Sequence, residues 1–212
     1  MKFKDRRHAG EILGEAVAGL RPTNPVVFCL PRGGAPVGFG VAAALDCPMD
    51  VLLVRKVGVP YQPELAMGAV GESGVVVRNT DVMSLAGIEP EDFDEIVRRE
   101  AALLDERLSG YRATAEAIDP AGLTAVVVDD GLATGSTARA AIDVLRERKP
   151  EQVWLAVPVG PADTVALLSG VADRVVAVDI PEHFGAVGLW YKDFTQTTDD
   201  EVRDLLARSR LR

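Results

Sequence analysis

The sequence predicts an α/β fold in which a mainly parallel sheet of about five strands is flanked by helices. Apolar runs of strand length alternate along the chain with segments of helical period, which is the pattern of parallel α/β proteins. The strand candidates are rich in Val or Leu on both faces, as strands covered by helices should be. Ligands of open parallel sheets collect at the carboxyl ends of the strands, so we expect the functional site there.

The elements follow one another in a regular order. Strands are predicted over residues 26–30, 51–54, 123–128, 153–157 and 174–178. Helices are predicted over residues 5–19, 35–45, 134–148, 163–168 and 198–208, with Asp5 as the N-cap of the first. A hairpin is expected over residues 67–78, with its turn at residues 72–74.

One segment interrupts this alternation. Residues 79–120 are interpreted as an insertion whose one strong element is a helix over residues 90–111. Its apolar side chains recur at helical spacing, and acids lead its first turn, where the helix dipole favours them. Residues 1–212 therefore form a single predicted domain that carries this helical insertion.

Charge and cysteine content limit the function. The chain of 212 residues has 23 Lys and Arg against 32 Asp and Glu, a formal net charge of −9, which argues against a nucleic-acid partner. No apolar run reaches the ~18 residues of a membrane span, and the charged start lacks the apolar stretch of a signal peptide. We expect a cytoplasmic protein with no membrane partner. Cys29 and Cys47 lack metal-ligand spacing and are interpreted as small core residues in a reducing compartment.

The most specific pattern is "TAVVVDDGLATGSTARAA", residues 124–141. A buried strand ends in Asp129 and Asp130, and a loop of glycines and hydroxyls then opens a helix. Gly131 and Gly135 allow a tight turn, and hydroxyls and amides at a helix N-terminus can cradle a phosphate. Because a phosphate would repel the two acids, they should face vicinal hydroxyls or a cation instead. A sugar phosphate satisfies both halves of the pattern.

Within this stretch, "AVVVDDGLATGST", residues 125–137, resembles the phosphoribosyl pyrophosphate (PRPP) motif of the type I phosphoribosyltransferases. The resemblance implies a type I phosphoribosyltransferase-like fold, with the ribose 2′- and 3′-hydroxyls on Asp129 and Asp130. It also implies a Mg²⁺ cofactor that these acids touch only through water or the sugar. The PRPP 5-phosphate would bind the residues of the following loop, which are Gly131, Leu132, Ala133, Thr134, Gly135, Ser136 and Thr137.

Two other loops complete the resemblance. "LPRGG", residues 30–34, looks like the pyrophosphate loop of the family, with Arg32 and Gly33 as its working pair. Arginine offers a fork of donors to phosphate oxygens, and glycine permits close approach. Such loops often carry a strained or cis peptide bond, which a sequence does not reveal.

Residues 54–74 stand where the family has a mobile loop that closes over the reaction centre, and their Gly and Pro residues indicate a loop without regular pairing. We expect Lys56 to reach pyrophosphate with support from Arg55. Glu64 is expected either to interact with an amine of the base or to form an ion pair with Lys56.

The implied activity is that of a Mg²⁺-dependent phosphoribosyltransferase, a pentosyltransferase of nucleotide metabolism. It would move the 5-phosphoribosyl group from PRPP to a nucleobase-like small-molecule acceptor and release pyrophosphate. The candidate catalytic residues are Arg32, Arg55, Lys56, Asp129 and Asp130. Two alternatives remain: a PRPP-sensing regulator with little or no transferase activity, and an unrelated sugar-phosphate enzyme with a similar loop. The sequence leaves the oligomeric state open, with a homodimer as the candidate assembly.

The acceptor site is the least defined part. "PEHFGAVGLWYKDF", residues 181–194, is similar in outline to the hood of purine-type members, so a hood is expected over residues 181–197. Its spacing departs from the purine pattern, since the acid follows the glycine by five residues rather than four, and this puts a purine substrate in question. The aromatic pair at 190–191 is equally compatible with core packing, and residues 6–8 offer an N-terminal alternative to the hood. The candidate acceptor residues are Phe184, Val187, Trp190 and Asp193.

Overall fold

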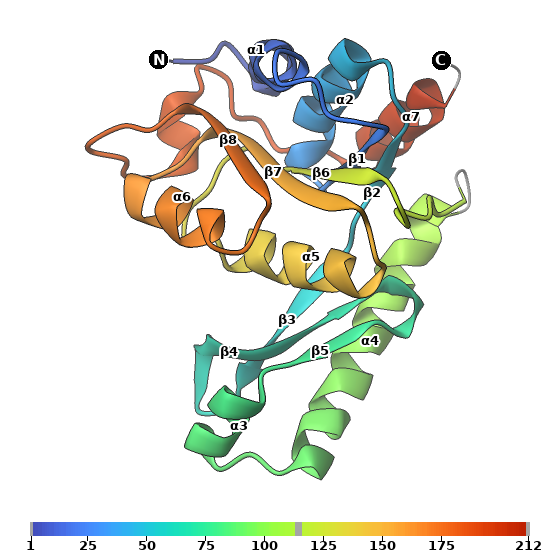
Figure 1. The fold of residues 1–212 in the computed structure, drawn as a ribbon, viewed down its shortest axis with the longest axis vertical. Coiled ribbons are helices and arrows are strands. Elements are labelled where there is room, and N and C mark those ends of the chain that lie inside the picture. The colour runs from blue at the N-terminus through green and yellow to red at the C-terminus, as the bar shows by residue number, and fades with distance from the viewer. Residues whose placement is uncertain (1, 113–115, 211–212) are drawn as a thin grey trace.

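The core of the protein is a five-stranded parallel sheet with the strand order β2-β1-β6-β7-β8 (Figure 1). The computed structural model describes residues 2–112 and 116–210. Every neighbouring pair in this sheet is parallel, as the alternation of apolar runs and helices predicts. The strands are β1 Pro25–Cys29, β2 Met49–Val51, β6 Thr124–Val128, β7 Gln152–Val159 and β8 Arg174–Asp179.

Helices cover both faces of this sheet (Figure 1). One face carries α1 (Arg6–Ala18), α2 (Gly34–Leu45) and α7 (Asp199–Ser209), and the other carries α5 (Ser136–Glu147) and α6 (Ala162–Ser169). The predicted N-cap of α1 is confirmed, because the Asp5 carboxylate accepts a hydrogen bond from the amide of His8 at 2.8 Å.

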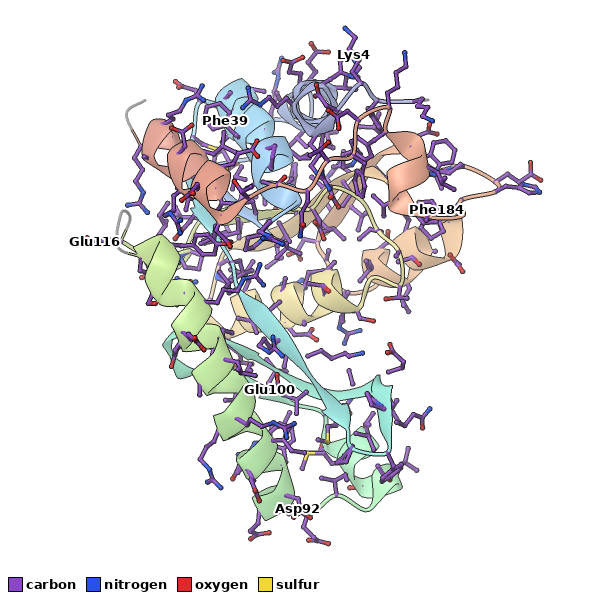
Figure 2. All side chains as sticks on the ribbon, turned by 180° about the vertical axis from the view of Figure 1, so that it is seen from behind. Lys4, Phe39, Asp92, Glu100, Glu116 and Phe184 are labelled. Carbon is purple, nitrogen blue, oxygen red and sulfur yellow. The ribbon has the colours of Figure 1, made fainter. Side chains whose placement is uncertain are left out.

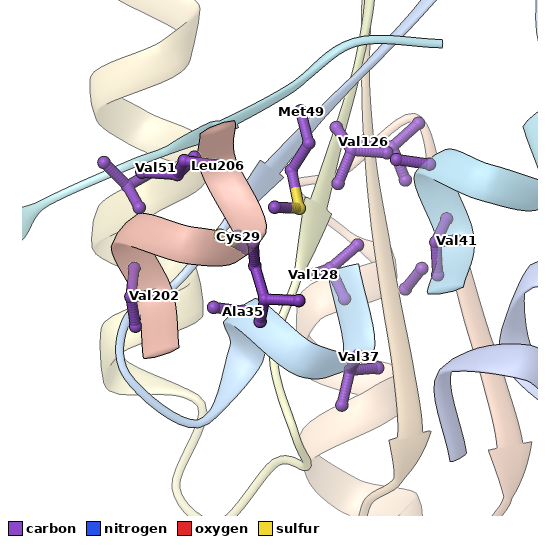
Figure 3. Close-up of a cluster of buried hydrophobic side chains, with 14 of the residues drawn as sticks. Cys29, Ala35, Val37, Val41, Met49, Val51, Val126, Val128, Val202 and Leu206 are labelled. Atoms are coloured by element: carbon purple, nitrogen blue, oxygen red, sulfur yellow. The ribbon is translucent and has the colours of Figure 1, made fainter. Parts of the chain in front are cut away.

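The two faces bury separate apolar clusters. The cluster under α1, α2 and α7 includes Cys29, Met49 and Val126 from the sheet and Val37 and Leu206 from the helices, all fully buried (Figure 3). Cys29 is thus a core residue, as predicted. Its burial raises the pKa of the thiol, so this group remains protonated and unreactive.

A second, antiparallel sheet lies on the outer side of α5 (Figure 1). We call it the small sheet, and it consists of β3 (Val54–Val59), β4 (Gln62–Gly71) and β5 (Val76–Arg78). The predicted hairpin is β4 and β5, joined by the 3₁₀ turn Glu72–Gly74 at the predicted position. The predicted inserted helix is α4 (Pro90–Arg112), which runs along the small sheet and back to the core.

The sequence-based interpretation is wrong at three points in this region. Within residues 54–74, Gly58, Pro60, Gln62 and Pro63 are predicted to make a loop without regular pairing, but β3 pairs with β4, and a bulge at Gly58 absorbs the irregular register. The core strand predicted at 51–54 is Met49–Val51, because the chain leaves the core and enters the small sheet at Val54. The insertion also contains a short helix that the sequence analysis missed, α3 (Thr80–Ala86), capped by Asn79 and ended by left-handed Gly87.

The small sheet has its own apolar cluster on the side of α3 and α4. Val57, Met67, Phe93 and Val97 are among its buried members. At the other end, a buried ionic network joins the small sheet to the core. The Arg112 guanidinium donates to Asp50 at 2.6 Å and to Glu72 at 2.7 Å, and both carboxylates are fully buried.

Candidate active site at the carboxyl edge of the sheet

The loops that follow β1 and β6 lie side by side. The two strands are parallel neighbours with Cys29 opposite Val128, and the amide of Leu30 donates to the carbonyl of Val128 at 2.9 Å. The PRGG loop (residues 31–34) therefore lies against the two acids that end β6. The peptide bond between Pro31 and Arg32 is cis.

Glycine is required at this contact. A Cβ at position 33 would lie 2.1 Å from Oδ2 of Asp130, and one at position 34 would lie 2.6 Å from the carbonyl oxygen of Val128. Both separations are far below an ordinary contact, so no side chain fits in either place without a shift. The two glycines of "PRGG" let this loop approach the acids directly.

The acid pair, Asp129 and Asp130, faces the loop from the end of β6. Oδ1 of Asp129 accepts the amide of Asp130 at 2.8 Å, and Oδ2 of Asp130 accepts Nε of Arg6 at 2.8 Å. Burial, and then the charge of Asp130, raise the pKa of Asp129 well above its usual range. Burial also raises the pKa of Asp130, against the opposing effect of Arg6. Arg6 is the cation that contacts this pair of acids, so a ligand that brings hydroxyls or a further cation would stabilise their ionised forms.

The GLATGST loop (residues 131–137) connects the acid pair to α5. Gly135 has φ of +74°, and a Cβ there would lie 2.7 Å from Cγ2 of Thr164, so both the backbone and the available space call for glycine. α5 begins at Ser136, and the hydroxyls of Thr134 and Ser136 lie 3.0 Å apart at its N-terminus. This arrangement presents hydroxyls and helix amides to an anion.

The three predicted basic residues lie in two places, Arg32 in the PRGG loop and Arg55 and Lys56 on β3. Nη1 of Arg32 is 3.6 Å from Oδ2 of Asp199, at the start of α7. Arg55 and Lys56 are successive residues of β3, so their side chains point to opposite faces of the small sheet. Nε of Arg55 lies 2.5 Å from Oε2 of Glu100 on α4, and Figure 2 labels Glu100 beside the small sheet. Nζ of Lys56 lies 3.3 Å from Oε2 of Glu64.

The predicted acceptor residues fall in two groups. Phe184, Val187 and Trp190 pack around Phe3 and Tyr191, at the side where Figure 2 labels Phe184. Nε1 of Trp190 donates to the carbonyl of Phe184 at 2.9 Å, which ties the two ends of this segment together across the short 3₁₀ helix Val187–Trp190.

Asp193 is exposed and has local partners. Its carboxylate accepts the hydroxyl of Thr195 at 2.6 Å and the amide of Thr195 at 2.9 Å, and these hydrogen bonds lower its pKa. Tyr191 is buried and its hydroxyl donates to the carbonyl of Asp130 at 2.6 Å, so of the aromatic pair it is this residue that packs in the core.

Arg6 is a partner of the acid pair that the sequence analysis missed. Its guanidinium bonds Asp130, donates from Nη1 to the carbonyl of Thr195 at 2.7 Å, and stacks over Phe194 with 3.9 Å to the ring centroid. A backbone pairing of Phe3 with residues 190 and 192 holds the N-terminal segment in place for this contact. The available signal was the basic cluster at residues 6–7, immediately after the predicted N-cap of α1.

The carboxyl edge of the parallel sheet thus joins the PRGG loop, the acid pair and the GLATGST loop. The family model described as phosphoribosyl transferase domain matches residues 4–190, and the chain belongs to this family. It is 48% identical over 207 residues to "Putative phosphoribosyl transferase Rv0571c" of Mycobacterium tuberculosis H37Rv and, equally, to "Putative phosphoribosyl transferase MT0597" of strain CDC 1551. The match covers 98% of this chain and 47% of each relative, so the chain spans about half of their length.

Solved structures support the same fold. The protein TT1426 from Thermus thermophilus is similar with a TM-score of 0.92 and 41% identity, over 98% of this chain and 99% of that one. The AQ2163 protein from Aquifex aeolicus, with a TM-score of 0.51, 12% identity and coverage of 95% and 85%, shares the fold alone.

Two structural features are absent from the described residues, a metal-binding cluster of side chains and a membrane-spanning helix. In residues 2–112 and 116–210, no group of three or more His, Cys, Asp or Glu side chains is arranged to hold a metal ion. Among the same residues, no helix combines the length and apolar character needed to cross a bilayer.

Proposed function

We propose that this domain transfers the 5-phosphoribosyl group of PRPP to a small-molecule acceptor with release of pyrophosphate. The observation that carries this proposal is the contact between the PRGG loop and the acid pair, next to a phosphate-type helix N-terminus. The three subsites of a phosphoribosyl diphosphate, for pyrophosphate, ribose diol and 5-phosphate, need these three chemistries side by side.

Each group has a defined task in this proposal. Asp129 and Asp130 accept hydrogen bonds from the ribose 2′- and 3′-hydroxyls, and the GLATGST loop binds the 5-phosphate. Arg32 holds the pyrophosphate, whose negative charge grows as the bond to C1 breaks, and Gly33 permits its close approach. Positive groups placed where charge develops stabilise the transition state more than the ground state.

Mg²⁺ is the proposed cofactor. Two adjacent carboxylates, with no third metal-ligating side chain grouped with them in the described part of the chain, suit an ion that keeps several waters and binds mainly through substrate oxygens. When bound, Mg²⁺ would offset the negative charge of the leaving group. Asp129 and Asp130 would hold it indirectly, through water or the ribose hydroxyls.

The acceptor is proposed to bind between the hood, residues 181–197, and the N-terminal segment. A cavity of about 350 Å³ lies there, and its lining includes Arg6, Asp193 and Thr195. The packing of Trp190 and Phe184 against the N-terminal segment favours a polar acceptor over one that stacks on these rings. The contact between Arg32 and Asp199 is 3.6 Å long, which leaves Arg32 able to turn to pyrophosphate.

The test is calorimetry with PRPP and Mg²⁺, followed by a screen of acceptors for pyrophosphate release. We expect PRPP to bind, and the double variant Asp129→Asn/Asp130→Asn to bind it at least about tenfold more weakly, because amides lose the charge that strengthens bonds to hydroxyls. A folded double variant with unchanged affinity would remove the assignment. If PRPP binds but no acceptor in the screen leads to release of pyrophosphate, the result would indicate the PRPP-sensing regulator.

A further inference from the structure

A cavity of about 240 Å³ lies between the small sheet and the first turns of α5. One wall is the end of the GLATGST loop, with Thr134, Gly135 and Ser136. The opposite wall is the small sheet, which contributes Lys56 together with the apolar Ala66 and Ala69. Figure 1 shows the small sheet beside α5, on the side of this helix away from the core.

Strand geometry directs Lys56 toward this cavity. Lys56 is the cross-strand partner of Ala69, which packs against the buried side chains of α5. Arg55 is the partner of Val70, which belongs to the cluster on the side of α4. Because partners across a strand pair share one face, Lys56 faces this cavity with Thr134 and Ser136, and Arg55 faces the opposite side of the small sheet. There Arg55 lines a separate cavity together with Pro31 and Thr137.

Lys56 is held weakly enough to exchange its partner. Its ammonium pairs with Glu64, whose side chain is 88% exposed, and exposed ion pairs contribute little to stability. The other basic residue of the cavity, Arg139, is bound by both carboxylate oxygens of Asp143 at 2.9 and 3.0 Å. Lys56 is therefore the cation that an incoming anion can most easily engage.

The cavity has the size and chemistry of a phosphate subsite. Its volume lies below the roughly 300–1,000 Å³ of pockets for drug-sized ligands, so it suits a phosphate with its attached carbon better than a whole nucleotide. A helix N-terminus, hydroxyls and one lysine are groups that bind phosphate. Residues 31–34 do not contribute to the lining, so a pyrophosphate on the PRGG loop would lie outside this cavity.

We infer that Lys56 binds the 5-phosphate of the ribosyl donor rather than the pyrophosphate, so that the small sheet completes the 5-phosphate subsite. This inference rests on the proposed function, because it assumes that the GLATGST loop receives a 5-phosphate. It assigns a ligand contact to the small sheet, and it reassigns a residue that the sequence alone associates with the leaving group.

The test compares two probes, ribose 5-phosphate and pyrophosphate with Mg²⁺, by calorimetry on the wild type and on Lys56→Met. The methionine keeps the apolar stem and removes the charge. We expect the affinity for ribose 5-phosphate to fall at least about tenfold and that for pyrophosphate to change less than about twofold. Lys56→Arg should restore most of the lost affinity, because it restores the charge.

Arg78→Ala is the matched control. Arg78 is on the same small sheet but faces α4, where it pairs with Asp94 at 2.6 Å. Its loss removes one positive charge without touching the cavity, so ribose 5-phosphate should bind as in the wild type.

Three results would overturn the inference while PRPP still binds to the wild type. They are unchanged ribose 5-phosphate affinity in Lys56→Met, a selective loss of pyrophosphate affinity, and an equal loss in Arg78→Ala. A wild type that binds neither PRPP nor ribose 5-phosphate would instead refute the proposed function, and the inference with it.

Discussion

Replacement of Gly33 by alanine tests whether the PRGG loop and the acid pair form one site. The backbone of Gly33 is right-handed, with φ of −60° and ψ of −35°, so alanine is acceptable there conformationally. The obstacle is space, because the new Cβ would lie 2.1 Å from Oδ2 and 2.7 Å from Cγ of Asp130. The carboxylate oxygen must move by about 1.3 Å to reach an ordinary contact of 3.4 Å.

That displacement is large enough to break the 2.8 Å hydrogen bond between this carboxylate and Arg6. It would likewise break the proposed hydrogen bond from a ribose hydroxyl to the same carboxylate. A hydrogen bond to a charged group contributes roughly 1.5–3 kcal/mol, and each 1.4 kcal/mol is a factor of ten. We therefore expect Gly33→Ala to bind PRPP about ten- to a hundredfold more weakly while it remains folded. The assay is calorimetry with PRPP and Mg²⁺, with a thermal melt to establish folding.

Two controls make the result specific. Gly19→Ala adds the same methyl group at a helix end where the nearest atom is 3.5 Å away, and it should leave PRPP affinity unchanged. In an Asp130→Ala background the clash is absent, so Gly33→Ala should then cost little further affinity. Wild-type PRPP affinity in folded Gly33→Ala would refute the reasoning that Asp130 must occupy this position.

Further predictions concern the charged groups around the site. Arg6→Ala should weaken PRPP binding in a titration because Asp130 loses its partner, whereas Arg7→Ala, whose side chain is 65% exposed, should not. Asp129→Asn should become more stable than the wild type as pH rises above about 4. The pKa of Asp129 is higher in the folded protein than its value of ~3.9 in the unfolded chain, so the folded wild type is stabilised below pH ~3.9. This stabilisation is lost as the pH rises through the pKa of Asp129 in the folded protein. Thermal melts from pH 4 to 8 would detect the divergence, and parallel curves would contradict it. Asp50→Ala should destabilise the fold by about 3–5 kcal/mol in urea, since Arg112 loses a buried partner; a loss below about 1 kcal/mol would show that the network is not structural.

The site features that could be predicted are those encoded locally. The strand that precedes Asp129 and the loop that leads into α5 lie within one continuous stretch, and their spacing alone places acids and helix amides at one sheet edge. The PRGG loop is placed at the same edge by one further expectation, which is that parallel strands end on the same side of the sheet. No long-range packing is needed for either inference.

The features that could not be predicted depend on distant contacts. Arg6 and Asp130 are 124 positions apart in the chain, and the basic cluster at residues 6–7 does not by itself identify Asp130 as the partner. The opposite directions of Arg55 and Lys56 follow from strand pairing. The sequence did not predict this strand, because Gly58 and Pro60 are typical of loops. A bulge and a tight turn satisfy these residues within a hairpin, which composition does not distinguish from an open loop.

The small sheet did leave one signal in the sequence of α5. A helix that covers a single sheet should bury one apolar stripe, but Ala138, Ala140, Ala141, Ile142 and Val144 are all buried around this helix. The residues of α5 that face the parallel sheet pack on the core, whereas Val144 contacts the small sheet. A Cβ added to Gly71 of the small sheet would lie 2.3 Å from Cγ1 of Val144. A helix buried on two sides has less freedom to shift than one exposed to solvent. Because the GLATGST loop is continuous with its first turn, the small sheet holds the anion-binding end of the site in position from the side opposite the core.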